Sequence, residues 1–141
     1  MRMADPRLDH VGFVVASAEA AAPDFARSVG AAKMSEVFHD PLQRVDVLFL
    51  YPPGSPAIEL ISPPADDPAS SPVASFLERG GGLHHICYEV ADLEEQLRTM
   101  QSRRALVVRP PKPAVAFGGR RIAWVMTMEK LLIEYVESEK S

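Results

Sequence analysis

Short apolar runs and helical segments alternate along the chain. In the first half, the runs 8–15 (LDHVGFVV), 45–51 and 57–62 are rich in β-branched and other apolar residues, which predicts strands. The alanine-rich segment 17–29 between the first two runs is followed by Gly30. That order predicts a helix with a glycine stop.

Less regular features also occur in this half. Pro23 lies inside the helical segment, so we expect the helix to begin near this residue or to bend there. A short strand is expected over 33–38. A proline-containing connection, 63–82, carries one short helix, with Ser71 as its expected N-cap and Pro72 as its first residue. The following glycine run ends that helix.

The second half repeats the order of elements. The run 83–90 (LHHICYEV) predicts a strand, and Asp92 followed by Glu95 is a carboxylate version of the capping box. The helix LEEQLRTMQSRR is expected next, and the proline-rich stretch RPPKP is interpreted as a connection. The last two predicted strands are 120–127 and 131–137.

A shift of 75 residues superimposes the two halves. It places His10 on His85 and Glu59 on Glu134, so the histidine-to-glutamate spacing is 49 residues in both halves. The same shift aligns Phe49 with Trp124 and Leu50 with Val125. Repetition of these features at one offset indicates a structural duplication.

The two repeated histidines share a strand face with small or polar residues. Alternation places His10 with Gly12, and His85 with Cys87 and Glu89. This pattern is typical of a strand that packs under a helix on one face, while the other face lines a cavity or is solvated.

Two imidazoles and two carboxylates on matching strands predict a divalent-metal site. Imidazole suits zinc, nickel, iron and cobalt, and carboxylates add negative charge. Four protein ligands on a six-coordinate ion leave positions for water or substrate. Such a metal polarises a carbonyl and stabilises the enolate that forms when the neighbouring proton leaves.

Three other residues that could carry chemistry are interpreted as structural. His84 lies on the packing face of its strand, where we expect a local hydrogen bond. His39 has no counterpart in the repeat and is expected in a loop. Cys87 is expected to be a small buried side chain, because no third catalytic group accompanies it.

Composition narrows the class of protein. The chain has 141 residues, of which 47% are hydrophobic and 24% charged, with a net charge of −4. These values predict one domain without the basic footprint of a nucleic-acid or membrane-surface protein. The N-terminus lacks a signal-peptide pattern, and no run approaches the roughly 18 apolar residues of a membrane span. A single cysteine fits a reducing compartment, so we predict a cytoplasmic protein.

The segments LDHV, GLHHICYEV and GGRRIAWV leading to LLIEYVE resemble the vicinal oxygen chelate superfamily. This superfamily includes glyoxalase I, extradiol dioxygenases, antibiotic-resistance proteins and methylmalonyl-CoA epimerase, whose branch the motifs resemble most. The resemblance implies an α+β fold of two tandem βαβββ modules, with a curved mixed sheet around a central cavity. We expect one domain, 1–141, with module one at 6–64, a linker with a short helix at 65–82 and module two at 83–138.

The resemblance also implies roles for individual residues. His10, Glu59, His85 and Glu134 would bind a divalent ion (Co, Ni, Zn, Mn, Mg or Fe), and Glu134 would also carry the proton. Epimerisation by proton transfer on both faces of a carbon needs a second acid–base group, and Val47 stands where the epimerase branch carries it. Asp46 is adjacent but would point to the other face unless a β-bulge intervened. Of Arg120 and Arg121, one is expected to meet an anionic substrate group.

The leading hypothesis is a metal-dependent isomerase, epimerase or lyase acting on a small carbonyl compound or an acyl-CoA thioester. One alternative is a lactoylglutathione lyase of the glyoxalase I type, which turns over a thiol–ketoaldehyde adduct. Another is a ring-cleaving dioxygenase, against which Glu59 argues because it would occupy a position that oxygen or substrate needs. A third is a non-catalytic ligand-binding protein. The resemblance also implies a homodimer.

Overall fold

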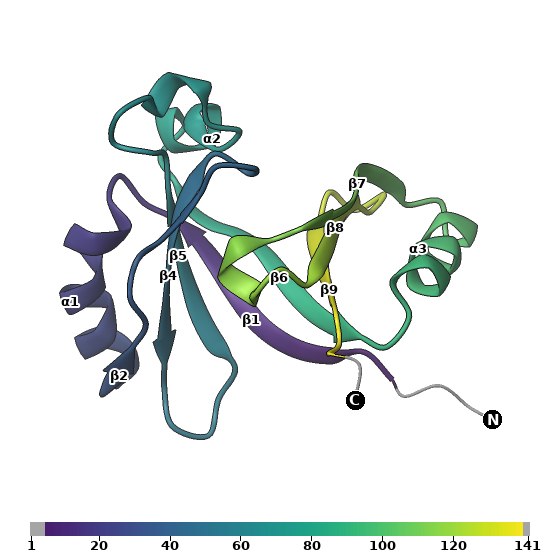
Figure 1. Cartoon of the computed structure of the whole chain (residues 1–141), viewed down its shortest axis with the longest axis horizontal. Helices are drawn as coiled ribbons and strands as arrows, with labels where there is room; N and C mark the ends of the chain where they lie inside the picture. The colour runs from purple at the N-terminus through teal and green to yellow at the C-terminus, as the bar shows by residue number, and fades with distance from the viewer. Residues whose placement is uncertain (1–4, 140–141) are drawn as a thin grey trace. The chain divides into compact units, whose positions relative to one another are not determined.

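The computed structural model describes residues 5–139 and divides into two compact units (Figure 1). The first unit is His10–His84, and the second contains the described residues 5–9 and 85–139. Residues 1–4 and 140–141 lie outside the described residues. They include the first residues of the N-terminal segment, in which no signal-peptide pattern is expected, and both ends of the expected 1–141 domain.

The first unit contains one mixed sheet and one long helix. Its elements are β1 (Arg7–Val14, from His10 onwards), α1 (Ala18–Val29), β2 (Lys33–Met34), β3 (Phe38–Asp40), β4 (Val45–Tyr51), β5 (Ala57–Ser62), a 3₁₀ turn (Pro68–Ser70) and α2 (Ala74–Glu78). β5 pairs with β1 in parallel and with β4 in antiparallel orientation. Both β2 and β3 pair antiparallel with β4, so together they act as one interrupted edge strand.

α1 covers one face of this sheet because its small residues recur on one side. Ala18, Ala22 and Ala26 are buried against Leu48, Leu50 and Leu60 of the sheet, as expected for residues spaced one turn apart. The predicted glycine stop at Gly30 is confirmed, and Ser17 caps the other end of the helix. The Ser17 side chain accepts a hydrogen bond from the Ala20 amide at 3.1 Å, and Gly30 adopts a left-handed conformation with φ of 71°. The helix starts at Ala18 and continues through Pro23, which excludes the expected later start.

The connection after β5 differs from the prediction. α2 begins at Ala74 and has Val73 as its N-cap, so the expected start at Ser71 and Pro72 is wrong. Ser71 instead ends the 3₁₀ turn that begins at Pro68, because a proline also favours the start of that turn. α2 ends at Glu78, and the predicted glycine run follows with positive φ, +116° at Gly80 and +67° at Gly81, whose amides donate hydrogen bonds to the Leu77 and Phe76 carbonyls. An added Cβ at Gly81 would lie 2.7 Å from the Val14 carbonyl oxygen.

The second unit repeats this arrangement. Its elements are β6 (Gly82–Val90, from His85 onwards), α3 (Leu93–Ser102), β7 (Leu106–Pro113), a 3₁₀ turn (Val115–Phe117), β8 (Arg121–Met126) and β9 (Leu132–Glu137). β9 pairs with β6 in parallel and with β8 in antiparallel orientation, and β7 pairs with β8. The Asp92 carboxylate accepts a hydrogen bond from the Glu95 amide at 3.0 Å, so the predicted cap of α3 is confirmed. Leu93, Leu97 and Met100 of α3 pack against the sheet.

β7 corrects the interpretation of RPPKP as a connection. The segment lies in a strand that follows the edge of the unit's sheet. The pairing with β8 shifts register between Val107 and Arg109 and again between Arg109 and Lys112. Prolines are tolerated at edges and bulges because no ladder hydrogen bond requires their missing N–H.

The two units therefore share one order of elements. A strand and a helix are followed in each unit by an edge strand, which is interrupted in one unit and bulged in the other, and then by two further strands. This order confirms the predicted α+β class built from two βαβββ modules.

Candidate functional site

The first unit brings His10 and Glu59 together. His10 lies on β1, and Glu59 lies on β5 beside Gly12, which points to the same face as His10. The His10 Nε2 and Glu59 Oε1 atoms are 3.3 Å apart. The exposed fractions are 0% for His10 and 4% for Glu59. Because Gly12 has no side chain, the carboxylate has room to reach the imidazole ring.

The second unit repeats this pair with His85 and Glu134. His85 lies on β6, and Glu134 lies on β9 beside the small residue Cys87. The distance between His85 Nε2 and Glu134 Oε1 is again 3.3 Å, with exposed fractions of 1% and 2%. Both pairs predicted from the 75-residue offset therefore form, each within its own unit.

An aromatic ring accompanies each pair. Phe49 lies opposite Glu59 in the register of β4 and β5, and its ring meets the His10 ring edge-on, with centroids 5.5 Å apart. Trp124 lies opposite Glu134 and meets the His85 ring at 4.6 Å. The two interplanar angles are both 74°. Such edge-to-face contacts restrict the rotation of the imidazole rings.

The geometry of each pair fits two neighbouring ligands of one divalent ion. Nitrogen and oxygen ligands lie about 2.0–2.2 Å from such an ion, so adjacent donor atoms are roughly 3.0–3.4 Å apart. The observed separation of 3.3 Å in both units agrees with this range. Imidazole with carboxylate is also a donor combination that zinc, iron, cobalt and nickel accept.

Val47 and Asp46 lie on opposite faces of β4. The register of β4 with β5 contains no shift, so the bulge that would have turned Asp46 is not present. Val47 is 4% exposed and shares the face of Phe49 and Glu59, because residues two apart on a strand point the same way.

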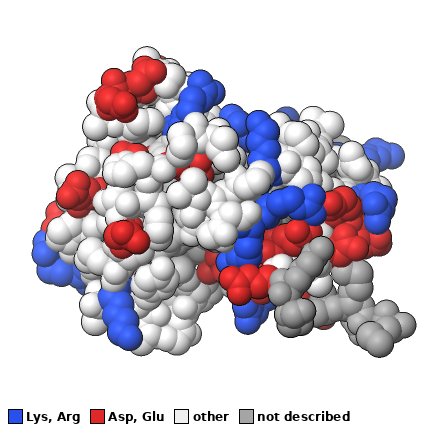
Figure 2. Space-filling view, in the orientation of Figure 1, with Lys and Arg blue, Asp and Glu red and all other residues white. Residues whose placement is uncertain are grey.

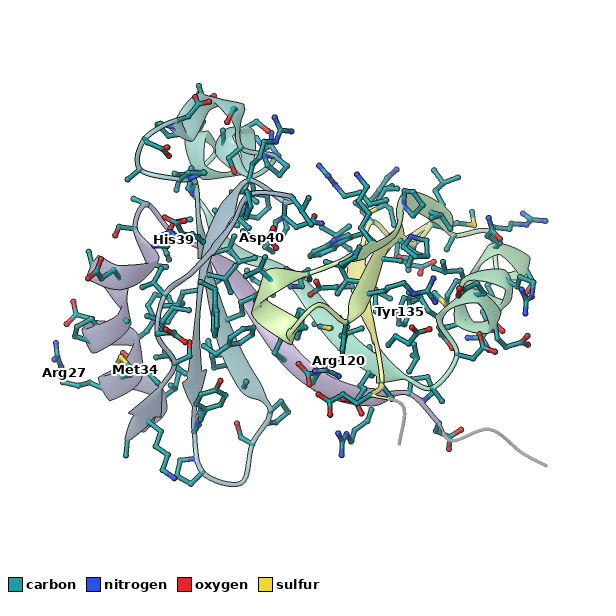
Figure 3. All side chains as sticks on the ribbon, in the orientation of Figure 1. Arg27, Met34, His39, Asp40, Arg120 and Tyr135 are labelled. Atoms are coloured by element: carbon teal, nitrogen blue, oxygen red, sulfur yellow. The ribbon has the colours of Figure 1, made fainter. Side chains whose placement is uncertain are left out.

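The Asp46 carboxylate instead pairs with His39. His39 lies in β3, so its expected position in a loop is wrong; the residue is labelled in Figure 3. His39 Nδ1 and Asp46 Oδ1 are 2.7 Å apart. This hydrogen bond and the Asp46 charge raise the pKa of the exposed His39. Both side chains line a hollow of about 650 Å³ on the first unit. The prediction missed this pair because its two residues come from different strands.

Arg120 and Arg121 are engaged by carboxylates of the second unit. Arg120 contacts Glu89 at 3.3 Å. Arg121 contacts Glu94 at 2.6 Å and Glu137 at 2.7 Å, and the hydrogen bonds that its guanidinium donates to Glu137 and Glu94 raise the pKa of Arg121. Figure 2 shows basic and acidic side chains next to one another on this part of the surface. The expectation that one of these arginines meets a substrate anion therefore has no support from the geometry.

The two remaining candidates, His84 and Cys87, pack against other residues of the fold. The His84 ring meets the Phe76 ring edge-on at 4.9 Å, and Cys87 is fully buried, as predicted. Among the described residues 5–139, no helix is long and apolar enough to cross a membrane.

Known proteins resemble the chain over most of its length. A family model described as the Glyoxalase/Bleomycin resistance protein/Dioxygenase superfamily matches residues 9–124. An ethylmalonyl-CoA/methylmalonyl-CoA epimerase of Cereibacter sphaeroides is 33% identical over 121 residues, which is 84% of this chain and 87% of the relative. An uncharacterized protein of Bacillus subtilis is 35% identical over 135 residues, with 93% and 91% covered. The solved structure of methylmalonyl-CoA epimerase from Mycobacterium tuberculosis gives a TM-score of 0.80 at 29% identity, covering 95% of this chain and 89% of that one.

Proposed function

Because this chain belongs to the glyoxalase/bleomycin resistance protein/dioxygenase superfamily, we propose that it is a metal-dependent enzyme that removes a proton next to the carbonyl of an acyl-CoA thioester. The observation that carries this proposal is the duplicated histidine–glutamate pair, buried in both units with the same 3.3 Å separation. The relative named ethylmalonyl-CoA/methylmalonyl-CoA epimerase supports the choice of a thioester.

In this proposal His10, Glu59, His85 and Glu134 together hold one divalent ion. The support is the donor chemistry of each pair and the repetition of both pairs at one offset. When bound, the ion polarises the substrate carbonyl and stabilises the negative charge that develops on its oxygen. The Phe49 ring holds the His10 imidazole, and the Trp124 ring holds the His85 imidazole, in a fixed orientation. This lowers the entropy cost of metal binding.

Glu134 is the group that accepts the proton and returns it. A carboxylate beside the reacting carbon acts as a general base, and the same group then delivers the proton as the acid. The Glu134 side chain is almost fully buried, so bulk water has little access to its carboxylate.

The position of Val47 favours a second candidate reaction. A two-base epimerase needs an acid–base group on each face of the carbon, whereas Val47 is apolar and Asp46 lies on the other face with His39. A lyase of the glyoxalase I type moves a proton between neighbouring carbons with one carboxylate. It therefore requires no group at position 47, and it also fits Glu59 as a charged ligand.

Proton exchange measured on metal-free and reloaded protein tests the proposal. The chelated protein is reloaded separately with Co²⁺, Ni²⁺, Zn²⁺, Mn²⁺, Mg²⁺ or Fe²⁺ and incubated in D₂O with methylmalonyl-CoA or with ethylmalonyl-CoA. We expect metal-dependent entry of deuterium at the α-carbon. Turnover of the hemithioacetal of methylglyoxal and glutathione would instead identify the lyase.

Neighbouring histidines provide the matched control. His85→Gln removes a proposed ligand, whereas His84→Gln changes an adjacent ring that contacts Phe76. We expect loss of bound metal and activity only in His85→Gln. Protein that binds none of these ions and exchanges no proton would contradict the proposal and favour a ligand-binding protein.

We also propose that the enzyme is a cytoplasmic homodimer. The family resemblance supports the dimer, and the single buried Cys87 fits a reducing compartment. Light scattering coupled to size-exclusion chromatography tests the dimer, and a mass of one chain would contradict it.

A further inference from the structure

The sheet of the second unit has one face that turns away from α3. Ala123 and Val125 of β8 pack with α3 in the core of this unit, so the intervening Trp124 points to the opposite face. Glu134 lies beside Trp124 in the register of β8 and β9 and shares that face. The proposed proton carrier and its neighbouring indole thus lie on the same face of the sheet.

The two register shifts of β7 bring basic residues to this face. Val107 pairs with Val125 on the α3 side, so a regular strand would place the apolar Val108 beside Trp124. The first shift places Arg109 there instead, and the second shift places Lys112 beside Ile122. Ile122 is two residues from Trp124 and therefore points the same way. Both cations consequently lie on the face that carries Glu134.

These cations differ from Arg120 and Arg121 of the same unit. Arg120 and Arg121 are each bound by glutamates. For Arg109 and Lys112, no ion pair or hydrogen bond of the side chain is found within the part of the chain that the structure describes. Arg109 is also partly buried, and a partly buried cation without a carboxylate favours the binding of an anion.

We propose that Arg109 and Lys112 bind an anionic group in the thiol part of the substrate, either a phosphate or a carboxylate. This inference rests on the proposed function, because it takes the substrate to be a thioester or a thiol adduct. Neighbouring strands are about 4.8 Å apart, so the backbones of Arg109 and Glu134 are separated by roughly 10 Å across β8. The bound anion is therefore remote from the reacting carbon. Guanidinium groups bind phosphate or carboxylate through two parallel hydrogen bonds.

The flat Trp124 ring lies between the anion site and Glu134. A substrate that spans both would pass over the indole, and we expect its uncharged part to pack there. The apolar neighbours of Trp124 in the cluster opposite α3 include Ile122 and Val136. The row Arg109–Trp124–Glu134 thus offers successive sites for an anion, an apolar linker and a reacting carbon.

Binding of free coenzyme A and of glutathione, measured by calorimetry on the complete chain, tests the inference. The variants are Arg109→Gln, Lys112→Gln and the double variant. Arg103→Gln is the control, because Arg103 is an exposed cation at the end of α3. Removal of one charge-assisted contact is expected to weaken binding about tenfold, and the double variant more. Binding to the wild type should weaken at higher salt.

The two probes distinguish the sources of the anion. A loss confined to coenzyme A identifies a phosphate, and a loss confined to glutathione identifies a carboxylate. Equal binding by the wild type and the double variant would overturn the inference, as would wild-type protein that binds neither probe. Because both probes are tested with metal-free as well as metal-loaded protein, the anion site is assessed even if proton exchange is absent.

The ratio of the changes in KM and kcat distinguishes substrate binding by Arg109 and Lys112 from a purely structural role of these residues. With an acyl-CoA substrate, the double variant should raise KM by about tenfold or more while kcat stays within about twofold. The matching acyl-pantetheine, which lacks the phosphates, should show the same KM with wild type and variant if coenzyme A phosphate is the anion. A KM increase of equal size with both substrates would contradict phosphate binding by these residues.

Discussion

The two glutamates of the duplication allow metal binding to be separated from proton transfer. Glu59→Gln and Glu134→Gln make the same chemical change at equivalent positions of the two units. Both carboxylates are almost fully buried, and both lie 3.3 Å from a histidine nitrogen. An amide occupies nearly the same volume but has no negative charge, so neither substitution opens a cavity.

The structure sets the relative size of the effects. Because the two pairs have the same donor distance and similar burial, we expect the two variants to lose metal affinity by a similar factor, at least about tenfold. At saturating metal, loss of a general base lowers kcat by about 10²–10⁴, which corresponds to roughly 2.7–5.4 kcal/mol of barrier. We expect this loss in Glu134→Gln, whereas Glu59→Gln should lose less than about tenfold, since it removes only ligand charge.

The assay combines metal titration with initial rates. Affinity is measured by calorimetry for one ion, and kcat is then measured at metal concentrations above the dissociation constant of each variant. Equal losses of kcat in the two variants would refute the assignment of the proton to Glu134. Unchanged metal affinity in both would refute the ligand assignment itself.

Three further substitutions test the pKa of His39, the core between α1 and its sheet, and the N-terminal cap of α3. Asp46→Asn should lower the pKa of His39 towards 6.5, the value for an unperturbed histidine, because the hydrogen bond and the Asp46 charge raise it. The stabilisation of the fold by this pair is present below the unfolded-state pKa of His39 and is lost as pH rises through the raised pKa. NMR titration measures the His39 pKa, and denaturation at pH 5 and pH 8 measures the change in stability. An unchanged His39 pKa in the variant would contradict the contact. Leu60→Ala should reduce the free energy of unfolding by about 2–5 kcal/mol in urea denaturation, since Leu60 is fully buried; a loss well under 1 kcal/mol would mean that the sheet does not pack on α1 as described. Asp92→Ala should lower the free energy of unfolding by about 1 kcal/mol, because it removes the cap of α3. An unchanged urea midpoint would show that the Glu95 amide has another hydrogen-bond acceptor.

The elements that position the candidate ligands could be predicted from the sequence. His10 and His85 lie in runs whose period and composition identify strands, and the common spacing of 49 residues to Glu59 and Glu134 identifies their partners. Spacing carries this information because each unit folds with the same register, which places each glutamate beside a small residue of the histidine strand.

The edge strands could not be predicted in the same way. β7 contains Pro110, Pro111 and Pro113, which normally end a strand. Only the tertiary structure shows that this segment pairs along one edge and that register shifts accommodate the prolines. The position of Arg109 depends on those shifts, so strict alternation would have assigned its side chain to the wrong face.

The contact between His39 and Asp46 also depends on the pairing of two strands. The sequence indicated that Asp46 faces away from Val47, which the structure confirms. It did not reveal His39 as the partner, because cross-strand contacts depend on which residues of two strands lie opposite each other. The position of Ser71 could not be predicted for a different reason, because a serine before a proline fits the start of a helix and the end of a 3₁₀ turn equally well.

Trp124 gives the protein an intrinsic optical probe. It is the only tryptophan of the sequence, and its ring lies 4.6 Å from the His85 ring. Indole emission responds to charges and transition-metal ions at this distance. Binding of the proposed metal ion to His85 is therefore expected to change the fluorescence of the protein. The state of one residue in the second unit can therefore be followed in solution without a label and without a substrate.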